Sequence, residues 1–164
     1  MKDWDKRPPE IAALLNPAFC GYLLSIGLIE YTNNIEEGAP YLFPFIQLPL
    51  VLHKPTRDIL PRSSRTSFSA WITGTNTAAA KVGFAERARR VSPYAKEALV
   101  FSLQHKRITV TDDGLLRVPS APPKSYRNAT REINECVRAA ILCGKWFSMI
   151  GDFKTAMALL GVKP

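Results

Sequence analysis

The pattern of apolar and polar positions across residues 82–119 predicts two helices joined by a tight turn. Apolar side chains recur at helical spacing over residues 84–90, with arginines between them. Ser92 and Pro93 then have the character of a helix start, because serine can cap free amides and proline has no amide to leave unpaired. A second helix is therefore expected from this point to about His105.

A short β-hairpin is expected after these helices. Residues 107–111 and 115–118 carry the β-branched and apolar residues of strands, and Asp112, Asp113 and Gly114 between them suit a tight turn. Two helices with a tight junction, followed by a hairpin, have the element order of a winged helix-turn-helix.

The other apolar runs predict further helices. Residues 41–52 are ambiguous, because Pro44 and Pro49 argue against a central strand while the continuous apolar run suits a buried helix kinked at Pro49. We favour the kinked helix over a strand. The remaining expected helices cover residues 10–15, 18–32, 66–74, 125–150 and 153–160, with Asn16, Ser67 and Asp152 as caps and Gly151 and Gly161 as breaks, and residues 75–80 are expected to form a loop.

The predicted fold is therefore mainly α with a small β-hairpin. A basic linker at residues 61–65 and a proline-rich connector at residues 120–124 suggest where its parts meet. The expected parts are a helical N-terminal lobe (1–60), a winged helix-turn-helix (61–119) and C-terminal helices (120–164) that pack on the same core.

Positive charge is concentrated in the middle of the chain. The net charge of the 164 residues is +8, but residues 54–131 hold fifteen Lys/Arg against five Asp/Glu, whereas residues 1–53 hold three against six. A basic block of this kind favours a polyanion or an acidic protein surface as partner, and a solvated basic face without a partner is the alternative.

The cysteines and the apolar segments indicate a cytoplasmic protein. Cys20, Cys136 and Cys143 are odd in number, widely spaced and placed in apolar runs, which favours buried reduced thiols over disulfides or metal ligands. The charged N-terminal residues do not resemble a secretory signal, and the most apolar run is too short and too rich in proline to span a membrane.

No sequence motif recommends an enzyme. The chain has no phosphate-binding glycine loop, no nucleophile elbow and no zinc-protease signature, and its two histidines, His53 and His105, are isolated. We expect a non-enzymatic protein that needs no cofactor and no metal.

Two groups of residues are candidates for binding. The second predicted helix offers Lys96 beside Glu97 near its start, which is a poor set for reading bases, so the cations suit non-specific contact with a DNA backbone or docking onto an acidic partner. The candidates for that contact are Arg62, Arg65, Arg87, Arg89, Arg90, Lys96, Arg107 and Arg117. The candidates for binding a protein partner lie on the strongly apolar helix 18–32 or just after the apolar run 41–52, where Arg57 is expected to be exposed; they are Phe19, Tyr22, His53, Lys54 and Arg57.

Four segments resemble a known family, the middle components of bacterial three-component ABC-ATPase conflict systems, which include the small third subunit of Lamassu-type anti-phage operons. The segments are RPPEIAALLNPAFCGYLL (7–24), LPLVLHKPTRDILP (48–61), GFAERARRVSPYAKEALVF (83–101) and LLGVKP (159–164). The resemblance implies a non-enzymatic adaptor in an antiviral defence complex. Such an adaptor would bridge an SMC-like ABC ATPase and an effector, often a nuclease, and would hold the effector inactive until the ATPase senses foreign DNA. The alternative from the residues is a free-standing winged helix-turn-helix regulator that binds DNA by itself.

Overall fold

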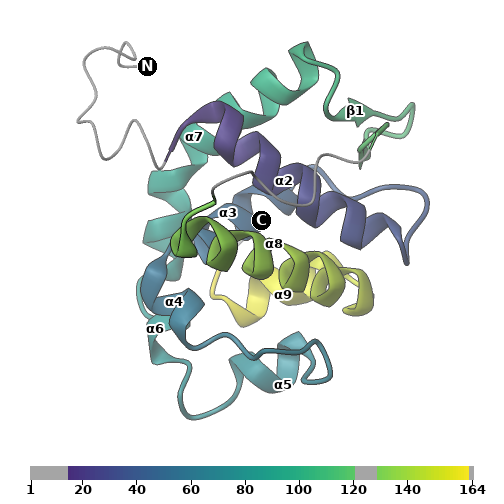
Figure 1. The fold of residues 1–164 in the computed structure, drawn as a ribbon. Coiled ribbons are helices and arrows are strands. Elements are labelled where there is room, and N and C mark those ends of the chain that lie inside the picture. The colour runs from purple at the N-terminus through teal and green to yellow at the C-terminus, as the bar shows by residue number, and fades with distance from the viewer. Residues whose placement is uncertain (1–14, 121–128, 163–164) are drawn as a thin grey trace.

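Helix α2 (Pro17–Thr32) runs through the centre of the computed structural model, which describes residues 15–120 and 129–162 (Figure 1). Asn16 caps this helix as expected, since its side chain accepts a hydrogen bond from the Ala18 amide at 2.8 Å. Every residue from Cys20 to Leu28 is buried. Helix α2 is apolar all round because other segments of the same chain bury it.

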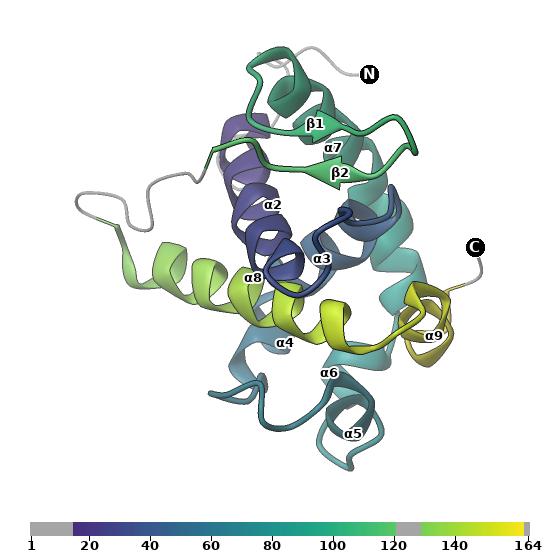
Figure 2. The same ribbon diagram turned by 90° about the vertical axis from the view of Figure 1, so that its right-hand side faces the viewer.

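Three helices surround α2. They are α3 (Phe43–Val51), α7 (Phe84–Gln104) and α8 (Arg131–Met149), and α7 and α8 lie on different sides of α2 (Figures 1 and 2). Glycines on α2 allow the close contacts: a Cβ on Gly21 would overlap the Ser102 hydroxyl of α7, and a Cβ on Gly27 would overlap the Gln47 side chain of α3. The two glycines of α2 thus lie where α7 and α3 come closest to it.

The predicted helix-turn-helix is wrong, because α7 is one continuous helix and Ser92 and Pro93 lie inside it. Its buried positions continue at helical spacing through the proline: Phe84, Ala88, Ala95, Ala98, Leu99 and Ser102. Pro93 is exposed and α7 packs along α2 and α3, so burial of one continuous face outweighs the lost backbone hydrogen bond.

The predicted hairpin is confirmed. Strands β1 (Thr109–Val110) and β2 (Leu116–Arg117) are antiparallel, with Thr109 opposite Arg117. The turn contains Gly114 at a φ of 79°, a conformation that glycine adopts without strain. The Ala39 amide donates to the Leu116 carbonyl at 2.9 Å and the Leu116 amide donates to the Ala39 carbonyl at 2.8 Å, which fixes the hairpin to the segment between α2 and α3.

Within residues 41–52, the favoured helix is present as α3 (Phe43–Val51), and Pro49 lies inside it. The short helices α4 (Lys54–Asp58) and α6 (Ala78–Lys81) were not predicted, and α6 replaces part of the expected loop 75–80. Helices α5 (Phe68–Ile72) and α9 (Phe153–Leu159) are confirmed, together with their caps Ser67 and Asp152. Gly151 and Gly161 both have positive φ, as helix breaks do.

Helix α8 begins later than predicted. Its cap is Thr130, whose hydroxyl accepts a hydrogen bond from the Ile133 amide, and residues 129 and 130 precede the helix. Residues 125–128 and nearly all of the helix expected at residues 10–15 lie outside the described part of the chain. The division into parts at residues 60 and 119 stays a prediction.

The three cysteines are buried thiols outside any disulfide, as predicted. Burial raises the pKa of Cys20 and Cys143 to about 12 and that of Cys136 to about 11. A thiol in such surroundings stays protonated near neutral pH and is a poor nucleophile.

Candidate docking site

The outer face of α7 is a stripe of exposed residues opposite the buried face of the same helix. We call this set the α7 stripe, and its members are Glu86, Arg89, Arg90, Pro93, Lys96, Val100 and Gln104. Their spacing of three or four residues places them on one side of a 3.6-residue helix. The stripe therefore presents cations along α7 to solvent.

One carboxylate is shared by two arginines at the start of the stripe. Glu86 accepts from Arg89 at 2.6 Å and from Arg90 at 2.9 Å, and the two arginine side chains remain 76% and 79% exposed. The hydrogen bond from Arg90 and the charge of Arg89 hold the pKa of Glu86 below its usual value. One negative charge against two positive charges leaves this end of the stripe cationic.

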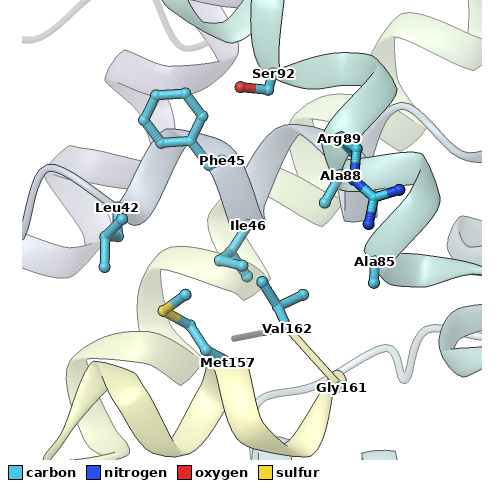
Figure 3. A pocket seen from close by; sticks show the side chains of 10 residues that line it. All are labelled: Leu42, Phe45, Ile46, Ala85, Ala88, Arg89, Ser92, Met157, Gly161 and Val162. Carbon is cyan, nitrogen blue, oxygen red and sulfur yellow. The ribbon is translucent and has the colours of Figure 1, made fainter. Parts of the chain in front are cut away.

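An apolar groove with a volume of about 470 Å³ lies beside the stripe (Figure 3). We call it the α3–α7 groove. Its lining residues come from α3 and the residue before it, from α7, and from α9 and the residues after it: Leu42, Phe45, Ile46, Ala85, Ala88, Arg89, Ser92, Met157, Gly161 and Val162. Its volume lies in the range of about 300–1,000 Å³ that is common for binding pockets.

The floor of the α3–α7 groove belongs to the hydrophobic core. Ile46, Ala88 and Met157 are 1%, 8% and 3% exposed. Phe45 at the rim is half-buried, and its ring packs against that of Tyr41 at a centroid distance of 5.3 Å, while Tyr41 is 49% exposed. The groove is thus a preformed apolar hollow that continues onto an exposed aromatic surface.

Most of the predicted cationic candidates are exposed. Arg89, Arg90 and Lys96 lie on the α7 stripe, Arg107 and Arg117 lie at the hairpin, and Arg62 and Arg65 lie in the loop before α5. In the part of the chain that the structure describes, Arg62, Arg65, Lys96, Arg107 and Arg117 form no ion pair. Each is thus an exposed cation that no carboxylate in the described residues neutralises.

Arg87 differs from the other candidates, because it holds the fold together. Its half-buried guanidinium donates to the carbonyl oxygens of Pro49 (3.3 Å), Ala80 (2.8 Å) and Val82 (3.4 Å) and lies 5.2 Å from the centre of the Phe84 ring. These carbonyls lie near the C-terminal ends of α3 and α6, where backbone acceptors lack helical partners. Burial lowers the pKa of Arg87 from its ordinary value.

The expectation that Arg57 is exposed is wrong. Its side chain is 1% exposed, donates to the Val51 carbonyl at 2.9 Å and forms an ion pair of 2.7 Å with Glu132 at the start of α8. The local sequence is polar, but α8 covers this position from a distant part of the chain. Arg57 therefore joins the ends of α3 and α8 and has no free charge to offer a partner.

His53 lies beside Arg57 and Arg87, and it is half-buried. Its Nδ1 atom is 2.8 Å from the hydroxyl of Thr56, which is fully buried. Burial, followed by the charges of Arg87 and Arg57, lowers the pKa of His53. Although a histidine beside a hydroxyl is one requirement of nucleophilic catalysis, this hydroxyl cannot reach a substrate where it lies. His105 is far away along the chain, at the end of α7, and stacks on Phe101 at 4.1 Å.

The other predicted partner contacts divide between core and surface. Tyr22 is 8% exposed, and Phe19 is half-buried and packs against the core, so the apolar residues of α2 serve the fold. Lys54 is exposed and pairs with Asp58 at 2.9 Å within α4.

The α3–α7 groove was not predicted from the sequence. One weak signal was present: Ala85 and Ala88 are small residues one turn apart on α7, and such positions leave space beside a helix. The walls of the groove come from three distant segments, so its shape depends on the tertiary fold.

The described residues contain neither a membrane-spanning helix nor a cluster of metal ligands. None of the helices in residues 15–120 and 129–162 has both the length and the apolarity that crossing a bilayer requires. Across the same residues, His, Cys, Asp and Glu side chains nowhere gather in threes as a metal site would need.

Comparison with known proteins gives one match. The model of the family "ABC-three component (ABC-3C) system Middle Component 3" matches residues 4–164. No curated protein and no solved structure matches the chain.

Proposed function

The chain belongs to the ABC-three component system Middle Component 3 family, and from this membership we propose that it is a non-enzymatic adaptor of an anti-phage defence complex. It bridges an SMC-like ABC ATPase and an effector, for example a nuclease, in the cytoplasm. It keeps the effector inactive until the ATPase senses foreign DNA. ATP is bound by the partner, and the adaptor acts through assembly.

The observation that carries this proposal is the α7 stripe beside the α3–α7 groove. Exposed cations and an apolar hollow lie together on one helix, and surfaces of that composition bind proteins. The charge of the stripe favours an acidic partner and speeds the encounter with it.

The buried polar groups support a structural role for the residues that most resemble a catalytic site. Arg57 and Arg87 bind backbone carbonyls, and the Thr56 hydroxyl beside His53 is enclosed. Their hydrogen bonds fix the junctions of α3 with α4, α6 and α8.

Contact with a DNA backbone is a second activity that one observation favours. Arg107 and Arg117 are exposed at the hairpin and form no ion pair with any described residue. Such cations would contact phosphates without reading sequence. The alternative function, a free-standing winged helix-turn-helix regulator, has lost its basis because α7 is continuous where that motif needs a turn.

Co-expression with the proteins encoded beside this chain tests the adaptor. We expect the chain to co-purify with an ABC ATPase and an effector, and we expect omission of the chain to separate these two. A chain that stays monomeric and captures neither protein would contradict the proposal. Turnover of nucleic acid or nucleotide by the purified chain would contradict its non-enzymatic part.

The DNA contact is tested by a gel shift at several salt concentrations. We expect the isolated chain to bind weakly, without sequence preference and with a steep loss on adding salt. Tight binding to one sequence would favour the regulator instead.

A further inference from the structure

We infer that the α3–α7 groove binds an acidic amphipathic helix from another subunit of the same complex (Figure 3). This inference rests on the proposed adaptor function and names the surface and the chemistry of one contact. The ligand is a protein segment, because the lining, the spacing and the charge of the groove each favour that class.

The lining of the groove fits apolar side chains. Eight of its ten residues are apolar or glycine, and the two polar ones are Ser92 and Arg89 at the edge formed by α7. A small polar metabolite needs several convergent polar groups, and a nucleic acid needs phosphate contacts along a surface, so neither would make use of this floor.

The spacing of the lining residues fits a helix. On α7 they occupy positions 85, 88, 89 and 92, which follow one face of the helix over two turns, or about 10 Å. Ala85 and Ala88 are short, so a partner can approach the α7 backbone closely. A helix that presents apolar anchors three, four and seven residues apart fits a hollow of this length.

The charge at the rim selects an acidic helix. No lining residue is acidic, and the Arg89 side chain is 76% exposed at the edge of the groove. The exposed side of α7 between residues 86 and 96 carries Arg89, Arg90 and Lys96 against the carboxylate of Glu86, which Arg89 and Arg90 already share. A partner helix with Asp or Glu beside its apolar anchors would complete the charge balance.

Binding measurements with matched variants test the inference. In the reconstituted complex, Ala85→Trp fills the groove and Arg89→Ala removes the charge at its rim. We expect each change to weaken binding of the partner subunit by roughly tenfold or more. The controls are Val110→Trp at the hairpin and Arg131→Ala at the start of α8, an exposed arginine that likewise pairs with a glutamate, Glu135; both lie outside the groove and the α7 stripe. We expect the controls to change binding by less than about threefold.

Circular dichroism must show that all four variants are folded, and photo-cross-linking identifies the occupant. With p-benzoylphenylalanine in place of Leu42, irradiation of the complex should cross-link an acidic amphipathic segment of a partner subunit. A cross-link to residues 1–14 of the same chain, to a second copy or to nucleic acid would overturn the inference.

The possible failures are distinguishable. If the complex forms and all four variants bind alike, the groove is not the contact and the adaptor function stands. If the unaltered chain does not assemble with its neighbours, both proposals fall.

Discussion

Gly144 of α8 lies against the carbonyl oxygen of Gly27 of α2, so closely that a Cβ atom on Gly144 would overlap that oxygen. The same Cβ would also lie 2.8 Å from the Cβ of Glu30. The contact joins two helices that are more than one hundred residues apart in sequence. It sets the distance between them at the centre of the fold.

Replacing Gly144 by alanine should therefore destabilise the protein. In an unconstrained helix the change from glycine to alanine adds about 0.5–1 kcal/mol of stability, whereas the overlap here should reverse the sign and cost about 1–3 kcal/mol. Urea unfolding followed by circular dichroism measures the difference. The exposed Asn134→Ala on the same helix should change stability by less than about 0.5 kcal/mol. A more stable Gly144→Ala protein would show that α2 and α8 are not in this contact.

Reversing the charge of Arg57 should unfold the protein, because a carboxylate at this position would be buried facing the carboxylate of Glu132. We expect Arg57→Glu to cost more than about 3 kcal/mol, and Arg57→Met to cost less because it buries no charge. Arg90→Glu, which reverses an exposed arginine, should leave the thermal transition nearly unchanged. Differential scanning calorimetry of the three variants checks this order of stability losses. An Arg57→Glu protein that folds as stably as the wild type would show that residue 57 lies at the surface.

Pro93 distinguishes a continuous α7 from two helices. Inside a helix, Pro93→Ala restores a backbone hydrogen bond and should stabilise the protein by about 1–2 kcal/mol, after allowance for the greater freedom of the unfolded chain. At the first position of a separate helix, the same change would give no such gain. Thermal unfolding gives the sign, with Lys96→Ala at the next exposed turn as the neutral control.

His53 should make stability depend on pH in one direction. Its pKa is lowered in the folded protein by burial and by the charges of Arg87 and Arg57, so the unfolded chain binds the proton more readily. The contribution of His53 is present above the unfolded pKa of about 6.5 and is lost as pH falls toward the lower folded pKa. We therefore expect the free energy of unfolding of the wild type minus that of His53→Gln to decrease as the pH falls from about 7.5 to about 5. Parallel curves would assign the dependence to other groups.

The thiols should be unreactive until the chain unfolds. Cys20, Cys136 and Cys143 are buried with raised pKa values, and both properties suppress attack by the thiolate. A thiol reagent at a pH of about 8 should label none of them in the folded protein and all three in denaturant, as absorbance would show. Rapid labelling of the native protein would mean that the core opens locally.

Local patterns predicted the helices well where the capping residue and the spacing of the apolar residues indicated the same helix start. Asn16, Ser67 and Asp152 cap helices as expected, and the hairpin lies where its turn residues placed it. At Ser92 and Pro93 the two signals conflicted: the cap signal indicated a break, while the apolar period continued. The buried face of α7 decided the outcome, because burial along two neighbouring helices contributes more than one lost backbone bond.

The candidate site was less predictable, because distant segments define it. Nothing within residues 48–61 indicates that Arg57 is buried, since its cover and its partner Glu132 come from α8. The α3–α7 groove likewise needs α3, α7 and the end of α9 in their final places. The exposed cations of the α7 stripe were predictable from composition and helical spacing alone.

The contact between Gly27 and Gly144 also bears on synthesis. The ribosome adds about 5–20 residues each second, so α2 waits several seconds before α8 emerges to cover it. During that interval an almost entirely apolar helix has no lasting cover from α8. Synthesis that stalls before residue 131 therefore leaves the side of α2 that faces α8 exposed, and it should favour aggregation of the nascent chain.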